Sequence, residues 1–252
     1  MLEFKNVDIS IGKTPILKDI SVSFEREKIT SIIGPNGSGK TTLLQTLNGL
    51  STVTAGNISI DGTDYLKLSV KERARKVSFM SQFRDTVPAI SIEGLVEHGR
   101  FPYMGFSRKK GNKDKEAIAY ALKYTELTDH RHQMITELSG GIRQRAYLAM
   151  QLAQDCPYMI MDEPMNYLDF PSQREMFGLV KKLASMEKTI IMVQHDLNQA
   201  LRISDRIVIM KDRKIVSCGT PLECLERGDI QRVFDCEIDK ISVNGSFQYI
   251  CI

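Results

Sequence analysis

The sequence predicts an α/β fold in which a mainly parallel β-sheet is preceded by an antiparallel β-segment and interrupted by an inserted helical segment. Three observations predict this fold. Short apolar runs typical of buried strands alternate with stretches of helical spacing. Between about residues 91 and 157 the strand signals give way to helical ones. The 252 residues, 42% of them hydrophobic, are enough to bury a large core without disulfides or metals.

The first elements are an antiparallel segment and a strand, loop and helix. Apolar and polar residues alternate from Leu2 to Phe24 around a turn at residues 12–15, which predicts antiparallel strands. The β-branched run Ile29–Ile33 predicts a buried strand that leads into a glycine-rich loop. Helical spacing then predicts a helix over Lys40–Leu50.

The later elements continue the alternation of strands and helices. Further buried strands are expected at Lys76–Met80, Tyr158–Met161, Thr189–Val193 and Arg206–Met210. Helices are expected after a capping Ser91, over Asp114–Leu127, Pro171–Met186 and Leu197–Ile203, and from Thr220-Pro221 onward. The tail beyond Asp239 predicts a hairpin at a sheet edge.

Charge, hydropathy and cysteine content exclude several classes of protein. The formal net charge is +3, and the pI near 8.5 is milder than the value above roughly 9 expected of a nucleic-acid binder. The longest apolar run, Ala117–Leu122, is far shorter than the roughly 18 residues of a membrane span. The N-terminus lacks the pattern of a secretory signal, so we expect a cytoplasmic chain. The five cysteines show no paired spacing and are expected to be reduced thiols.

The loop after Ile33 has the pattern of a phosphate-binding loop. It reads Gly34-Pro35-Asn36-Gly37-Ser38-Gly39-Lys40-Thr41-Thr42, which fits G-x-x-x-x-G-K-[ST] between a strand and a helix. Glycines let the backbone wrap closely around a polyphosphate and present its N–H groups at the positive end of a helix. Lys40 is then expected to reach the β- and γ-phosphates, and the Thr41 hydroxyl to bind Mg²⁺. A chance match to a glycine-rich turn is the alternative interpretation.

An acidic pair follows the strand Tyr158–Met161. Asp162 and Glu163 stand at the carboxyl end of this apolar run, which in a parallel sheet is the edge where the phosphate loop also lies. We expect Asp162 to hold Mg²⁺, directly or through water. Glu163 is expected to orient and polarise the attacking water, since phosphoryl transfer depends on positioning and charge stabilisation. Taken alone, such a pair is usually a strand leaving the core.

A third motif makes the resemblance to a family specific. Leu138-Ser139-Gly140-Gly141 opens a charged helix upstream of Glu163, and it strongly resembles the signature motif of the ATP-binding cassette (ABC) ATPases. A simple helix start capped by Ser139 is the alternative, and both readings are compatible. Other family elements follow in order: Gln82 resembles the Q-loop glutamine, residues 166–169 resemble the D-loop, and His195 resembles the switch histidine.

The resemblance implies a P-loop NTPase core and the following residue roles. Glu163, His195 and Gln82 would be catalytic, with His195 on the γ-phosphate and Gln82 near both Mg²⁺ and the transport partner. The family implies that ATP is bound by the phosphate loop of one protomer and by the signature motif of a second copy. The residues expected to contact it there are Ser139, Gly140, Gly141 and the D-loop Asp169.

The resemblance also implies a biological setting. Residues 2–236 would form one nucleotide-binding domain, with a core at 2–84 and 158–236, a helical subdomain at about 85–157 and a tail at 237–252. Local matches at residues 97–105, 143–154 and 195–200 look most like ATP-binding subunits of importers for iron(III)-siderophores, haem and cobalamin. Such a subunit would lie at the cytoplasmic side of the cell membrane. Its partners would be a second copy, a permease dimer and, indirectly, an extracytoplasmic substrate-binding protein, without nucleic acid.

Several features depart from the family or suggest alternatives. Ile11 stands where many relatives carry an aromatic residue that stacks on adenine, which puts base stacking in doubt. His130 and His132 could suggest a metal pair, but surface histidines without a third ligand are the simpler interpretation. A soluble ABC ATPase that remodels DNA or ribosomes is the alternative function, although the short interval between Lys40 and Asp162 leaves no room for coiled-coil arms. A nucleotide sensor without turnover is a third possibility.

Overall fold

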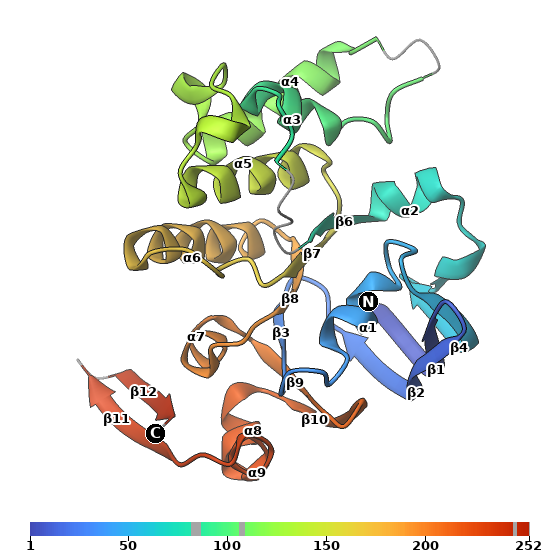
Figure 1. Cartoon of the computed structure of the whole chain (residues 1–252), viewed down its shortest axis with the longest axis vertical. Helices are drawn as coiled ribbons and strands as arrows, with labels where there is room; N and C mark the ends of the chain where they lie inside the picture. The colour runs from blue at the N-terminus through green and yellow to red at the C-terminus, as the bar shows by residue number, and fades with distance from the viewer. Residues whose placement is uncertain (82–86, 106–108, 244–245, 252) are drawn as a thin grey trace. The chain divides into compact units, whose positions relative to one another are not determined.

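The chain folds into two compact units, seen in the computed structural model of Figure 1. The structure describes residues 1–81, 87–105, 109–243 and 246–251. The first unit consists of Met1–Lys67 together with Thr189–Ile252, and the second of Leu68–Lys188. The division predicted from the sequence, with a helical subdomain at about 85–157, remains a prediction.

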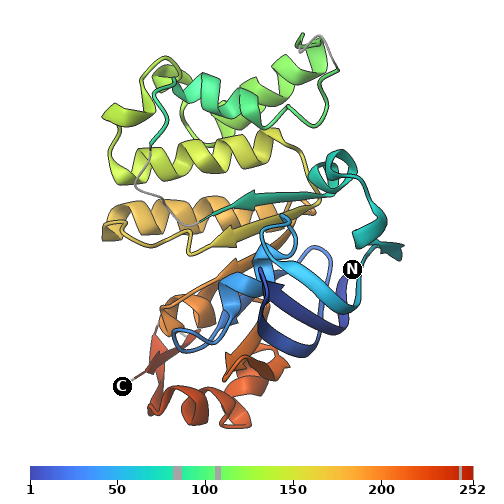
Figure 2. The same cartoon turned by 45° about the vertical axis from the view of Figure 1, so that its right-hand side comes forward.

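An antiparallel sheet opens the first unit. It contains β1 (Leu2–Ile11), β2 (Thr14–Phe24), β4 (Thr52–Ile60) and β5 (Thr63–Asp64) in the order β2-β1-β4-β5. β1 and β2 form a hairpin in which Ile11 pairs with Thr14, and their blue ribbons lie side by side in Figure 2. The predicted antiparallel segment is confirmed.

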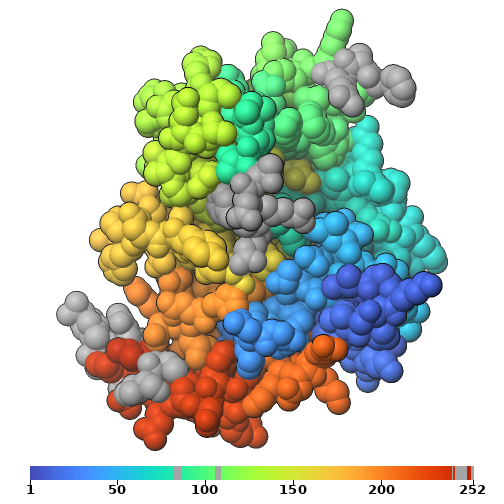
Figure 3. Space-filling view, viewed as in Figure 1, coloured from blue at the N-terminus to red at the C-terminus, as the bar shows by residue number. Residues whose placement is uncertain are grey.

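The first unit also contains parallel strands. β3 (Ile29–Ile33) lies between β8 (Thr189–Val193) and β9 (Arg206–Lys211) and pairs with both in parallel, while β10 (Lys214–Gly219) pairs antiparallel with β9. Every residue of β3 and β8 is buried, as expected of strands covered on both faces. β10 lies against β2, and in Figure 3 its orange atoms border the blue atoms of the N-terminal strands.

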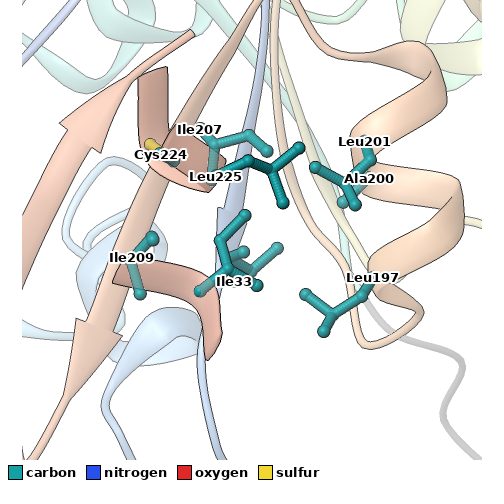
Figure 4. Packing of buried hydrophobic residues seen from close by; sticks show 9 residues of the cluster. Ile33, Leu197, Ala200, Leu201, Ile207, Ile209, Cys224 and Leu225 are labelled. Carbon is teal, nitrogen blue, oxygen red and sulfur yellow. The ribbon is translucent and has the colours of Figure 1, made fainter. Parts of the chain in front are cut away.

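Short helices pack against β3 and β9, and the apolar side chains of these helices and strands form one buried cluster. The helices are α7 (Leu197–Ile203), α8 (Pro221–Glu226) and α9 (Asp229–Phe234). Figure 4 shows the cluster in which Ile33 of β3 and Ile207 and Ile209 of β9 gather with apolar side chains of α7 and α8. β11 (Ile238–Val243) and β12 (Ser246–Cys251) form the predicted hairpin, but as a separate two-stranded sheet.

The second unit combines one pair of parallel strands with helices. β6 (Val77–Met80) pairs in parallel with β7 (Tyr158–Asp162), with Met80 opposite Met161. Its helices are α2 (Val70–Lys76), α3 (Ile92–His98), α4 (Asn112–Tyr124), α5 (Gly140–Ala153) and α6 (Phe170–Ala184). Short 3₁₀ turns lie at Tyr65–Lys67 in the first unit and at Thr128–His130 and Ile135–Glu137 in the second. α3 and α4 pack against α5, as Figures 1 and 2 show.

A buried ion pair links the helices of the second unit. Arg100 Nε donates to Asp114 Oδ1 at 3.0 Å, and Arg100 Nη1 donates to the carbonyl oxygen of Ala153 at 2.7 Å. The N–H of Gly111 and the guanidinium of Arg100 hold the pKa of Asp114 below its usual range. Because both charges are buried and bonded, this pair fixes the segment after α3 to the start of α4 and the end of α5.

The length of one predicted helix needs correction, and several elements were not predicted. The helix predicted over Lys40–Leu50 is shorter: α1 spans Lys40–Gln45. The hydroxyl of Thr46 donates to the Leu43 carbonyl, and the N–H groups of Leu50 and Ser51 both turn back to the carbonyl of Gln45. The sequence patterns also missed β4, β10, α2 and α9. No helix in the described ranges joins the length and the apolar character that crossing a membrane requires.

Candidate active site

The phosphate loop joins β3 to α1 in the first unit, as predicted. Gly39 is the N-cap of α1 and has φ +96°, a left-handed conformation that favours glycine, and a Cβ there would lie 2.5 Å from Leu17 Cδ2. At Gly34 a Cβ would lie 2.1 Å from the carbonyl oxygen of Met210. Glycine at these two positions is therefore required by the backbone path and by the neighbouring strand β9.

Lys40 lies inside this loop. The residue is 5% exposed, and its Nζ donates hydrogen bonds to the carbonyl oxygens of Gly34 at 2.8 Å and Pro35 at 3.0 Å. The Ser38 hydroxyl is buried with no hydrogen-bond partner in the described part of the chain. The loop thus surrounds a buried ammonium group and an unsatisfied hydroxyl, which fits the recognition of a polyphosphate.

A hollow of about 430 Å³ lies beside the loop tip. It is lined by the loop residues Pro35, Asn36, Gly37 and Ser38 and by Lys211, Asp212 and Arg213 of the β9–β10 turn. The turn residues Asp212 and Arg213 adopt φ values of +49° and +64°. Two cations therefore stand close to the phosphate loop within the same unit.

His195 follows β8 at the edge of the sheet where the phosphate loop begins. The N–H of Gln194 donates to the carbonyl oxygen of Ile32 at 3.1 Å, next to the start of the loop. The His195 side chain is exposed. Asp196 caps α7 by accepting a hydrogen bond from the N–H of Gln199 at 3.1 Å. The first unit therefore places the predicted histidine and the phosphate loop at one edge, because both follow parallel strands.

The acidic pair ends β7 in the second unit. Asp162 is 3% exposed and Glu163 is 9% exposed. Glu163 has φ +54°, a left-handed conformation that is uncommon for a residue with a side chain. Asn166 donates its side-chain amide to Glu163 Oε2. A buried carboxylate is thus held in a defined position at the end of a strand.

The signature segment, residues 138–141, leads into α5. The hydroxyl of Ser139 accepts a long hydrogen bond of 3.5 Å from the N–H of Ile142, so the predicted capping role of Ser139 is confirmed. A Cβ on Gly141 would lie 2.4 Å from Ser172 Oγ, so glycine is needed where α5 begins beside α6. Asp169 caps α6 through the N–H of Ser172 at 3.0 Å. Hydrogen bonds from Ser172 hold the pKa of Asp169 below its usual range.

The predicted site residues fall into two groups. Lys40, Thr41 and His195 belong to the first unit with the rest of the phosphate loop. Ser139, Gly140, Gly141, Asp162, Glu163 and Asp169 belong to the second unit. The predicted catalytic and metal-binding Gln82 lies outside the described residues.

The sequence patterns did not single out two side-chain amides near Glu163, those of the partly buried Asn166 and the buried Gln144. Asn166 contacts the carboxylate itself, and Gln144 of α5 donates to the carbonyl oxygen of Pro164 at 2.8 Å. Polar residues among the apolar positions of a buried helix could have signalled Gln144. Among the described residues, no group of three or more His, Cys, Asp and Glu side chains could hold a metal ion. The His132 side chain is 74% exposed and lies 3.7 Å from Glu93.

The phosphate loop, the acidic strand end and the α/β architecture define a nucleotide-binding protein of the P-loop class. The chain belongs to the ABC transporter family, whose model matches residues 17–166. The predicted resemblance is therefore confirmed, and the chain is an ABC ATPase.

Comparison with individual proteins agrees with this assignment. The chain is 39% identical to the petrobactin import ATP-binding protein YclP of Bacillus subtilis (strain 168), over 94% of each chain. It is 30% identical, with a TM-score of 0.76, to a dimeric ATP-binding cassette, MJ0796, in a post-hydrolysis state bound to ADP and Pi, covering 88% of this chain and 99% of that one. A metal-chelate type ABC transporter in an inward-facing conformation matches in fold, with a TM-score of 0.84 at 22% identity, covering 100% and 97%. The predicted fold class is confirmed.

Proposed function

We propose that this chain is the ATP-hydrolysing subunit of an importer for an iron–siderophore or a related metal chelate. The observation that carries the proposal is the likeness to an import ATP-binding protein over 94% of both chains. The retained phosphate loop, with its buried Lys40, supplies the nucleotide chemistry that such a subunit needs.

The proposed nucleotide site begins at the phosphate loop. Its backbone N–H groups and Lys40 would bind the β- and γ-phosphates, and the Ser38 hydroxyl is available for a further hydrogen bond. His195, at the same edge of the first unit, would contact the γ-phosphate. These roles are supported by the geometry of the first unit and by family membership.

The proposed hydrolytic group is Glu163. A carboxylate held by Asn166 would accept the proton of the attacking water and orient that water toward the γ-phosphate. Thr41 and Asp162, with Gln82, would hold Mg²⁺. Oxygen donors of this kind fit Mg²⁺, which takes few protein ligands and completes its shell with water and phosphate oxygens. When bound, the ion would neutralise charge on the phosphates.

The site would be completed by a second copy of the chain. Ser139, Gly140 and Gly141 present small residues at the start of α5, where a helix N-terminus favours an anion. In this proposal the segment meets the γ-phosphate of ATP bound to the partner, and Asp169 lies nearby in the D-loop. The dimeric form of MJ0796 supports such an arrangement.

The remaining partners follow from the proposed role. The chain would act at the cytoplasmic face of the cell membrane, with a permease dimer as its direct partner and an extracytoplasmic substrate-binding protein as an indirect one. No nucleic acid is needed for this cycle.

Reconstitution tests the proposed function. The chain is purified with the permease that accompanies it in native membranes, and both are placed in vesicles. Uptake of a ferric siderophore is expected to require this chain and hydrolysable ATP, and to stop in the Glu163→Gln variant. Association with ribosomes or DNA, without a permease and without uptake, would instead support the soluble remodelling function.

A further inference from the structure

Gln144 is buried where the signature helix meets the end of the acidic strand. The residue is 3% exposed. Nε2 donates a hydrogen bond to the carbonyl oxygen of Pro164 at 2.8 Å and lies 3.4 Å from Met80 Sδ at the end of β6. The same amide therefore touches the residue that follows Glu163 and the strand that leads toward Gln82.

The backbone that Gln144 holds is strained. Glu163 has φ +54°, and Tyr167 has φ +61°. Left-handed conformations of residues with side chains cost free energy and persist only where the surroundings fix them. The contacts that fix this turn include three hydrogen bonds. The Asn166 side-chain amide donates to the Glu163 carboxylate, the Asn166 N–H donates to the Glu163 carbonyl oxygen at 3.2 Å, and the Gln144 side-chain amide donates to the Pro164 carbonyl oxygen.

Gln144 belongs to the same rigid element as the signature segment. α5 starts at Gly140, directly after the capping Ser139, and Gln144 lies about one turn further on. A displacement or rotation of the helix start is therefore transmitted to the Gln144 amide. Through the carbonyl of Pro164 it reaches the peptide that carries Glu163.

We propose that Gln144 is a positioning residue that makes the placement of Glu163 depend on the signature segment Ser139–Gly141. The inference rests on the proposed function, in which that segment meets ATP on the partner copy and Glu163 orients the attacking water. Contact with the partner's nucleotide would then fix the position of α5, and Gln144 would in turn fix the position of the Glu163 carboxylate. Hydrolysis would therefore follow closure of the dimer.

Gln151 of the same helix provides a matched control. It is 1% exposed and donates to the carbonyl oxygens of Ser78 at 3.1 Å and Ile160 at 2.9 Å, both inside strands. It resembles Gln144 in type, burial and bonding, but its acceptors lie within β6 and β7 and not after Glu163. A purely structural role predicts equal effects of replacing either glutamine.

The first test compares Gln144→Met with Gln151→Met in the full-length chain. For Gln144→Met we expect kcat to fall at least ten-fold, with the Kd for ATP changed less than two-fold. For Gln151→Met we expect kcat per folded molecule to stay within two-fold of the parent. Gln144→Glu keeps the shape but removes the N–H donor, so it should share the loss. It also serves as the second variant if Gln144→Met does not fold.

A double-mutant cycle tests the coupling between the signature segment and Gln144. Ser139→Ala is combined with Gln144→Met and, separately, with Gln151→Met. The effect of Ser139→Ala on kcat should shrink at least three-fold in the Gln144→Met background and stay unchanged in the Gln151→Met background. Independent effects of Ser139→Ala and Gln144→Met, or wild-type kcat in both Gln144 variants, would overturn the inference.

The Glu163→Gln variant separates this inference from the proposed function. If Glu163→Gln keeps full turnover, the role proposed for Glu163 fails. If Glu163→Gln is inactive while Gln144→Met and Gln144→Glu turn over normally, that role stands and the inference about Gln144 alone is wrong.

Discussion

The side-chain amide of Asn166 donates a hydrogen bond to the carboxylate of Glu163, three residues earlier in the chain. The contact spans a turn in which Glu163 itself adopts φ +54°. A left-handed residue with a side chain costs roughly 1–2 kcal/mol, which the fold sustains at the residue proposed to orient water. The amide thus selects one orientation of the carboxylate of a residue that is 9% exposed.

We expect Asn166→Ala to reduce turnover more than nucleotide affinity. Hydrogen bonds to charged groups contribute roughly 1.5–3 kcal/mol, which corresponds to a decrease in kcat of about 10- to 100-fold. Asn166→Ser, which keeps a short donor, should lose less. Steady-state ATPase assays and ATP titrations measure the two quantities, and Asn57→Ala on the exposed side of β4 serves as control. A change in Kd alone would contradict the role of Asn166.

Replacing Glu163 with Gln removes the proposed proton acceptor and keeps the side-chain shape. General-base catalysis contributes about 10²- to 10⁴-fold, so hydrolysis should fall by at least 100-fold. ATP should still bind, and the unhydrolysed ATP should trap a closed dimer. Size-exclusion chromatography with light scattering detects this dimer. Glu116→Gln, at an exposed position of α4, should behave as the parent. Unchanged steady-state turnover in Glu163→Gln would refute the assignment.

Local patterns predicted the buried parallel strands and the phosphate loop because their signals lie within a few residues. β3 is rich in β-branched residues, with every residue buried, and the loop has its glycines where the backbone requires them. The end of α1 could not be predicted from local sequence patterns. It depends on the Thr46 hydroxyl bonding to the Leu43 carbonyl and on the chain turning back to Gln45. β4 escaped detection because its first residues are mostly exposed and include Gly56.

The groups around Glu163 show the limit of sequence reasoning more sharply. An acidic pair after an apolar run is visible in the sequence, but the conformation of Glu163 is not. Gln144 belongs to a predictable helix, whereas its acceptor, the Pro164 carbonyl, lies 20 residues away and meets it only through tertiary packing. The motifs therefore predicted the candidate site residues. The side chains that hold these residues in place could be identified only from the folded structure.

Lys40→Ala should weaken ATP binding strongly. The ammonium group is buried inside the phosphate loop, and losing one charge-assisted contact to a phosphate costs roughly 1.5–3 kcal/mol, or about 10- to 100-fold in Kd. Titration with a fluorescent ATP analogue measures the change. Lys18→Ala removes the same charge from an exposed position of β2 and should leave the Kd unchanged. An unaltered titration for Lys40→Ala would contradict the role of the loop.

The buried pair of Arg100 and Asp114 should make stability depend on acid pH. The pKa of Asp114 is lowered by the Gly111 N–H and by Arg100, so its contribution is present above the usual Asp value of about 3.9. It is lost as the pH falls through the lower folded-state pKa. Asp114→Asn should destabilise the chain by on the order of 3 kcal/mol at neutral pH, because Arg100 stays buried without its partner charge. Urea unfolding should then show a weaker loss below pH 4 in the variant than in the parent.

Arg213→Gly should stabilise the chain. Asp212 and Arg213 form the two-residue turn between β9 and β10, and both have positive φ. Turns of this type favour glycine at the second position, because a Cβ there costs roughly 1 kcal/mol. Removing the Arg213 side chain relieves that cost, so the urea midpoint should rise. Lys214→Gly, one residue later in β10, removes the same charge from a strand position where glycine is unfavourable, and should lower the midpoint. If Arg213→Gly also lowered it, contacts of the arginine side chain would outweigh the relief of strain in this turn.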